Sequence, residues 1–157
     1  MENNTVLVYL CGPIAGLTYD EANDWRQRFV DEIATWAWPI KALSPLRYRE
    51  ELRLAGRLQR TVPLELKGAI NTPRGAALRD ELDVRRCQFL FANFLGATTV
   101  SQFSLGEIGM ARGLRKTIIT VMEPDNVHHH RVMDHWLDYI ETDLESGLTL
   151  LKQLILP

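Results

Sequence analysis

The sequence predicts an α/β protein with one domain, residues 1–157, built as a three-layer, doubly wound, open parallel sheet of about five strands. Two observations predict this class. Short apolar, β-branched runs alternate along the chain with amphipathic helical segments, which is the order of a parallel sheet covered by helices. The 157 residues, 46% of them hydrophobic, suffice for one core, and no Ser/Gly-rich linker divides them.

The expected strands are apolar runs bounded by turn residues. They are Thr5–Leu10, Ile40–Leu43, Gln88–Phe94, Thr117–Met122 and a weak strand near Asp138–Glu141. The expected helices have apolar residues at steps of three and four, and the first opens with a capping box of Thr18 and Glu21. They cover residues 18–36, 74–86, a segment around 105–111, and 144–154. The order is that of a Rossmann-like or flavodoxin-like sheet.

Residues 46–73 have the least regular pattern, an Arg/Leu-rich stretch compatible with a helix and then a loop that ends at Thr72-Pro73. An insert of this length between core elements is often a binding loop or a lid. In open α/β sheets, ligands bind at the carboxyl ends of the strands. Three loops are expected there, residues 11–17, 94–102 and 123–131.

The charge balance argues against a nucleic-acid polymer as ligand, because the formal net charge is −2 and such proteins carry a basic excess. The arginines of residues 47–60 are interrupted by two glutamates. They form either a solvated helix face or a place where one arginine meets a phosphate. No apolar run is long enough to span a bilayer, and the polar start Met1–Asn4 is not a secretory signal. Cys11 and Cys87 are isolated, so we expect reduced thiols in a cytoplasmic protein.

Glu107 is the strongest candidate for chemistry, because it lies in or near the first turn of a helix that follows a strand and a loop. A helix N-terminus favours a carboxylate, so Glu107 should stay ionised. Gly106 and Gly109 remove side-chain bulk on either side, so that a ligand can approach the backbone. The alternative is a glutamate that satisfies free N–H groups at a helix start, with glycines that serve helix–sheet packing.

Two further side chains are candidates. Asp80 lies on the helix before the third strand, and the alternative is a surface carboxylate paired with Arg79 or another nearby arginine. Tyr9 is the penultimate residue of the first expected strand, and its hydroxyl emerges near the site if its side chain faces the loops. The alternative is a partly buried aromatic ring.

The loop Gly12–Gly16 and the tract His128–His130 are weaker signals. The loop has neither Gly-x-Gly-x-x-Gly nor a Walker lysine, although its backbone N–H groups can hold an anion. Adjacent histidines in a loop rarely converge on one ion, and no Cys or acidic residue stands at ligand spacing from them. We therefore expect no metal and no cofactor.

Together these segments resemble the nucleoside 2-deoxyribosyltransferase-like family. The resemblance rests on VYLCGPIAGL at 8–17, Arg79-Asp80, ANFLGA at 92–97, residues 101–107 and Met122-Glu123, and it spans most of the chain apart from 46–73. It implies a doubly wound five-stranded sheet. It also implies that Glu107 attacks the anomeric carbon of the sugar, that Tyr9 orients Glu107, and that Asp80 protonates the departing base.

The resemblance also bears on the substrate, a small nucleotide or nucleoside. Relatives that act on free nucleosides carry an acidic residue six positions before the nucleophile, where this chain has Ser101. Related 2′-deoxynucleoside 5′-monophosphate hydrolases have a serine there that contacts the phosphate, which an aspartate would repel. The expected substrate-binding residues are Gly12, Pro13, Ile14, Gly16, Ser101, Ser104 and Gly106.

The family further implies a homodimer or larger homo-oligomer in which a neighbouring subunit's loop completes each site. Loop 123–131 is the natural candidate, with Asn126, His128 or Arg131 reaching across. Three functions remain open. The favoured one is hydrolysis of a (2′-deoxy)nucleoside 5′-monophosphate at its N-glycosidic bond. The others are base exchange by a nucleoside 2-deoxyribosyltransferase and a non-catalytic nucleotide sensor on the same scaffold.

Overall fold

Residues 5–58 and 72–157, which the computed structural model describes, form one five-stranded sheet. The strand order is β2-β1-β3-β4-β5, and every neighbouring pair is parallel. The strands are β1 Val6–Cys11, β2 Ile40–Leu43, β3 Phe89–Asn93, β4 Thr117–Val121 and β5 Tyr139–Glu141. The helices are α1 Tyr19–Ala34, α2 Pro73–Arg86, α3 Gln102–Gly113 and α4 Leu144–Ile155. The predicted fold class, strands and helices are confirmed, with ends displaced by a few residues.

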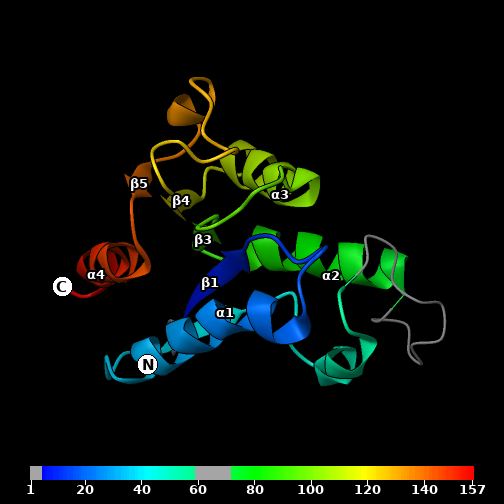
Figure 1. Cartoon of the computed structure of the whole chain (residues 1–157). Coiled ribbons are helices and arrows are strands. Elements are labelled where there is room, and N and C mark those ends of the chain that lie inside the picture. The colour runs from blue at the N-terminus through cyan, green and yellow to red at the C-terminus, as the bar shows by residue number, and fades with distance from the viewer. Residues whose placement is uncertain (1–4, 59–71) are drawn as a thin grey trace.

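Helices cover both faces of this sheet and give three layers (Figure 1). Helices α1 and α4 pack on the face where Val8 and Leu10 of β1 point. Helices α2 and α3 pack on the opposite face, where Tyr9 and Cys11 point. Successive side chains of a strand alternate between the two faces. This alternation directs Tyr9 toward α3, the helix that carries Glu107.

The strand order fixes where a ligand can bind. Strand β1 lies between β2 and β3, so the chain winds to one side of β1 first and to its other side afterwards. The carboxyl ends of β1 and β3 therefore border a crevice, and open α/β sheets bind their ligands in such a crevice.

The described part of the insert, residues 46–58, is packed against the start of α1. Its Arg/Leu-rich stretch forms a short 3₁₀ helix, η1 Glu50–Ala55. Leu46, Leu52 and Leu58 join Tyr19 and Ala22 in one apolar cluster. The arginines of this stretch make contacts within the chain, such as Arg53 with Asp20 at 3.0 Å. The remainder of the predicted binding loop, residues 59–71, lies outside the described residues.

The expectations drawn from composition concern membrane-spanning helices, metal sites and the two cysteines. Within residues 5–58 and 72–157, no helix is long and apolar enough to cross a membrane. The same two ranges hold no group of three or more His, Cys, Asp or Glu side chains placed to bind a metal ion. Cys11 and Cys87 are both buried free thiols, as predicted.

Candidate active site

A cavity of about 340 Å³ opens at the carboxyl ends of β1 and β3. Two of the three loops predicted for this position line it. They contribute residues 12–15, which follow β1, and residues 99–104, which lead into α3. Pro45, Asp80 and Glu107 complete the lining. Loop 123–131 does not line the cavity in this chain.

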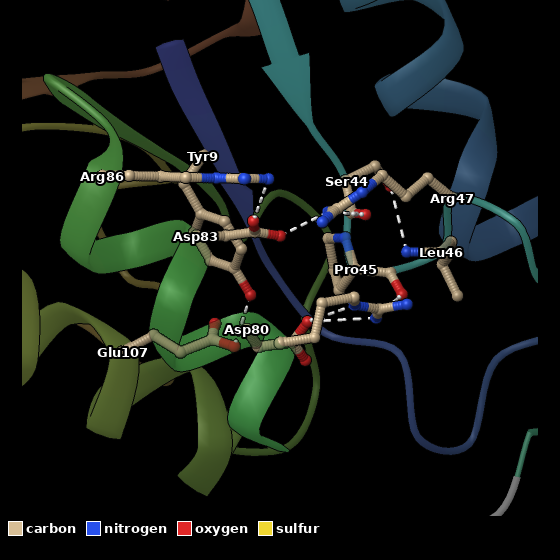
Figure 2. A network of polar contacts seen from close by, with 10 residues as sticks. Tyr9, Ser44, Pro45, Leu46, Arg47, Asp80, Asp83, Arg86 and Glu107 are labelled. Atoms are coloured by element: carbon tan, nitrogen blue, oxygen red, sulfur yellow. Dashed lines mark hydrogen bonds and ion pairs between the residues drawn. The ribbon is translucent and has the colours of Figure 1, made fainter. Parts of the chain in front are cut away.

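Tyr9 and Glu107 meet at this cavity through a direct hydrogen bond. The Tyr9 hydroxyl donates to Oε1 of Glu107 at 2.7 Å, and the tyrosine side chain is fully buried. Figure 2 shows the two side chains directed toward each other from β1 and α3. The sequence predicted this pairing of orienting residue and nucleophile only through the family resemblance. Alternation along β1 is its physical cause.

Glu107 differs from expectation in its ionisation. It is the sixth residue of α3, in the second turn, where the helix N-terminus acts only weakly. Burial raises the pKa of Glu107 to about 7, although hydrogen bonds from Tyr9 and Cys11 lower it. The negative charge of Asp80 raises this pKa further. Glu107 is therefore divided between its ionised and protonated forms near neutral pH.

The two donors that face Glu107 stay protonated. Burial raises the pKa of the Tyr9 hydroxyl and of the Cys11 thiol well above their usual values. The Cys11 Sγ also lies 3.6 Å from the carbonyl oxygen of Ser104, to which it donates. Neutral donors at these positions stabilise the ionised form of Glu107, the form that a nucleophile requires.

Asp80 lies on α2 and lines the same cavity. Its Oδ1 pairs with the Arg79 Nη2 at 3.0 Å. Burial raises the pKa of Asp80, while the positive charge of Arg79 lowers it. Asp80 is thus paired with Arg79, as one sequence interpretation expected, and it also lines the cavity that contains Glu107.

Gly12 and its neighbours form the cavity wall after β1. A Cβ on Gly12 would lie 2.7 Å from the backbone oxygen of Asn93, so only glycine fits there. The Gly12 carbonyl accepts a hydrogen bond from Nη2 of Arg26 at 3.0 Å. Pro13 and Ile14, which the sequence predicts to bind substrate, line the cavity. Gly16 does not, since its N–H instead binds the carbonyl of Leu58 outside the lining at 2.7 Å.

Ser101 and Ser104 place two hydroxyl groups on the cavity wall at the start of α3. Their Oγ atoms are 2.9 Å apart. Gly106, predicted to border the ligand, does not line the cavity, and a Cβ there would meet nothing within 4 Å. Gly106 therefore faces open space on the exposed side of α3.

Asn126 and His128 do not contact the cavity in this chain. Both are buried, and both bind groups of the same chain. The Asn126 Nδ2 donates to the Phe94 carbonyl at 2.8 Å, and the Ser101 N–H donates to Nε2 of His128 at 2.8 Å. Within this chain their polar atoms brace the loop that leads to Ser101. That Asn126, His128 or Arg131 completes a neighbouring subunit's site stays a prediction.

Arg26 is a functional-site neighbour that the sequence reasoning missed. It is fully buried on α1, and it contacts the carbonyls of Gly12 and Ala22. Burial lowers its pKa to about 10, and the negative groups of the cavity oppose that shift. One signal was present, because residue 26 follows Ala22 by four and precedes Phe29 by three, which places it on the apolar face of that helix.

Comparisons with known proteins bear on the fold. No protein-family model matches this sequence, and no curated protein matches it. The structure is similar to CMP N-glycosidase BcmB from Clostridium botulinum, with a TM-score of 0.51 and 13% identity over 94% of this chain and 98% of that chain. It is also similar to a conserved protein from Enterococcus faecalis V583, with a TM-score of 0.54 and 16% identity over 93% and 87%. The fold that the family resemblance implied is the fold of both structures.

Proposed function

We propose that this protein cleaves the N-glycosidic bond of a (2′-deoxy)nucleoside 5′-monophosphate and releases the free base and the sugar phosphate. One observation carries the proposal, the 2.7 Å hydrogen bond from Tyr9 to Glu107 at a cavity that Asp80 also lines. A similar fold in a CMP N-glycosidase supports the same class of chemistry. The cavity of about 340 Å³ falls within the range of small-molecule sites.

In the first step, an oxygen of ionised Glu107 bonds to the anomeric carbon while the bond from that carbon to the base nitrogen breaks. The bonding electron pair leaves with the base, and protonated Asp80 gives its proton to the base. The carboxylate stabilises the positive charge that develops on the sugar and then captures it as a glutamyl ester. Tyr9 holds Glu107 in the orientation for attack.

In the second step, water attacks the same anomeric carbon and the bond from the sugar to Glu107 breaks. Asp80, now ionised, accepts a proton from this water, so both carboxyl groups return to their starting states. The step releases the sugar phosphate. Groups of this chain supply both the nucleophile and the acid.

The start of α3 supports a place for the phosphate. The first backbone N–H groups of a helix lack partners within the helix, and they favour an anion. The hydroxyls of Ser101 and Ser104 lie beside them on the cavity wall. Hydroxyl and backbone N–H donors of this kind can bind a phosphate.

One observation favours a second candidate, base exchange between nucleosides. Among the described residues that line the cavity, two are acidic, Asp80 and Glu107, and none is basic. A nucleoside carries no phosphate, so it meets no repulsion from them. A transferase would form the same glutamyl ester and release it to a second base instead of water.

The two candidates are separated by product analysis. The wild-type protein is incubated with a panel of nucleoside 5′-monophosphates and nucleosides, in the ribose and deoxyribose series, with and without an acceptor base. Sugar 5-phosphate and free base support hydrolysis of a nucleotide, whereas a new nucleoside supports transfer. Glu107→Gln is the control, and cleavage by this variant at the wild-type rate would reject Glu107 as nucleophile. Mass spectrometry of a quenched reaction should find the sugar ester on Glu107.

A further inference from the structure

Two carboxylates of α2, one helical turn apart, are each held by arginines. Asp83 is fully buried, and it pairs with Arg86 at 2.6 Å and with Arg47. Asp80 pairs with Arg79. Figure 2 shows Asp80 and Asp83 beside the turn that follows β2. The ion pair of Asp83 with Arg47 ties α2 to the turn after β2, whereas the pair at Asp80 borders the cavity.

Arg79 makes a more specific contact than a surface ion pair. Its Nε and Nη2 both donate to Oδ1 of Asp80, at 3.2 and 3.0 Å. Its Nη2 also donates to the carbonyl of Pro45 at 2.5 Å. The Arg79 side chain is only 9% exposed. One planar guanidinium thus joins two residues of the cavity lining that come from α2 and from the turn after β2.

The contact between Arg79 and Asp80 determines which carboxyl oxygen of Asp80 can carry the proton. Both donors of Arg79 reach Oδ1, so that oxygen is the one less able to take a proton. In the described part of the chain, no donor binds Oδ2 of Asp80. The proton of a protonated Asp80 therefore resides on Oδ2.

We propose that Arg79 is a positioning residue, which holds Oδ1 of Asp80 and the Pro45 carbonyl together so that Oδ2 presents the proton to the departing base. This inference rests on the proposed function, because it assigns a role within the same reaction. Arg79 does not touch the reacting atoms and acts through Asp80.

The charged and titratable groups that surround Asp80 come from four elements and from the turn after β2. They are Arg79 and Asp83 on α2, Arg47 after β2, Tyr9 on β1, Glu107 on α3 and Arg26 on α1. Of these groups, Arg79 opposes most strongly the rise in the pKa of Asp80 that burial causes. Loss of Arg79 should therefore raise this pKa, and the acid should stay protonated to higher pH.

The test compares Arg79→Gln and Arg79→Lys with Arg85→Gln, a control on the same helix. Arg85 is 62% exposed and pairs with Glu81. Each variant is assayed on the best nucleotide substrate and on a p-nitrophenyl glycoside of the same sugar phosphate. The p-nitrophenolate leaves without a proton, so its release does not need the acid. Circular dichroism and thermal unfolding establish that each variant is folded.

For Arg79→Gln we expect kcat on the nucleotide to fall about 10- to 100-fold, which is part of the roughly 100- to 10,000-fold that a general acid contributes, because Asp80 itself is retained. On the p-nitrophenyl substrate the loss should stay below about threefold, and the limb of the pH profile on the nucleotide that reports Asp80 should move to higher pH. Equal losses on both substrates, or a limb that does not move, would overturn the proposal. If Arg79→Gln does not fold, Arg79→Lys decides. Lysine keeps the charge but lacks the Nε–H that also donates to Oδ1 and the planar guanidinium that fixes the direction of these bonds. A selective loss on the nucleotide therefore supports the role, and wild-type rates reject it.

The wild-type protein separates failure of this inference from failure of the proposed function. Absence of cleavage on every nucleotide, nucleoside and p-nitrophenyl substrate rejects the function itself. Cleavage by the wild type, combined with Arg79 variants that behave like Arg85→Gln, rejects only the role of Arg79.

Discussion

The backbone N–H of Ser101 donates to Nε2 of His128 at 2.8 Å, so this ring nitrogen carries no proton. The Nδ1 atom lies 3.0 Å from Oδ1 of Asn126. The Asn126 amide nitrogen already donates to the Phe94 carbonyl, so Oδ1 accepts and Nδ1 carries the proton. His128 also stacks on Phe94 with ring centroids 4.0 Å apart. The neutral imidazole of His128 thus fixes the position of Ser101, the residue at the start of α3 that lines the cavity.

This arrangement predicts a pH dependence of stability. Burial lowers the pKa of His128 in the folded protein, so its contribution is fully present above the unfolded value of about 6.5. The contribution is lost as the pH falls from there through the folded value. We expect the free energy of unfolding to decrease below pH 6.5, with a slope of up to about 1.4 kcal/mol per pH unit from this one proton. Urea unfolding at several pH values measures the slope, and His128→Gln should flatten it.

His129 provides the matched control. The Pro124 carbonyl and Asp134 raise the pKa of His129, so its contribution is present at low pH and lost as the pH rises. Removing this residue should therefore change the slope in the opposite sense. A His128→Gln variant with the wild-type slope would show that the contact with Ser101 does not depend on a neutral ring.

Tyr9→Phe tests the proposed role of Tyr9 in orienting Glu107 for attack. The substitution removes the hydroxyl that donates to Glu107 and leaves the ring in place. Hydrogen bonds to charged groups contribute about 1.5–3 kcal/mol, so we expect kcat/KM to fall about 10- to 100-fold. The same bond lowers the pKa of Glu107, and its loss should move the acid limb of kcat/KM, near pH 7, to higher pH. Activity should therefore fall more at pH 6 than at pH 8, and a uniform loss would argue against this effect.

The sequence predicted what local patterns determine. Alternation along β1 and the steps of three and four in the helices define the sheet and its layers, and Tyr9 then faces α3 as a consequence. The role of His128 could not be predicted, because its contact with Ser101 joins residues 27 positions apart through two loops. Arg26 was missed because charged side chains are seldom buried. The ionisation of Glu107 depends on burial, which a sequence pattern does not give.

Gly106→Ala tests whether activity requires a residue without a side chain next to Glu107. The residue lies within α3, and its added Cβ meets nothing within 4 Å. Alanine in a helix interior is favoured over glycine by about 0.5–1 kcal/mol, so we expect a more stable protein with unchanged kcat and KM. A loss of activity above about tenfold, or roughly 1.4 kcal/mol, would restore Gly106 to the substrate site.

Gly147→Ala should have the opposite effect on stability. Gly147 lies on α4 against the sheet, and a Cβ there would stand 2.5 Å from Cγ1 of Val121 and 2.9 Å from Cζ of Phe91. Phe91 is held in turn by the edge-on ring of Phe29, 5.1 Å away between centroids, so α4 must shift outward instead. Overpacking of this kind costs about 1–3 kcal/mol, which exceeds the gain of up to about 1 kcal/mol from helix propensity. Urea unfolding of Gly147→Ala and Gly106→Ala in parallel measures the expected decrease and the expected increase in the free energy of unfolding. A Gly147→Ala variant as stable as the wild type would mean that α4 moves freely on the sheet. Since the cavity lies at the ends of β1 and β3 and not under α4, kcat should change little in either case.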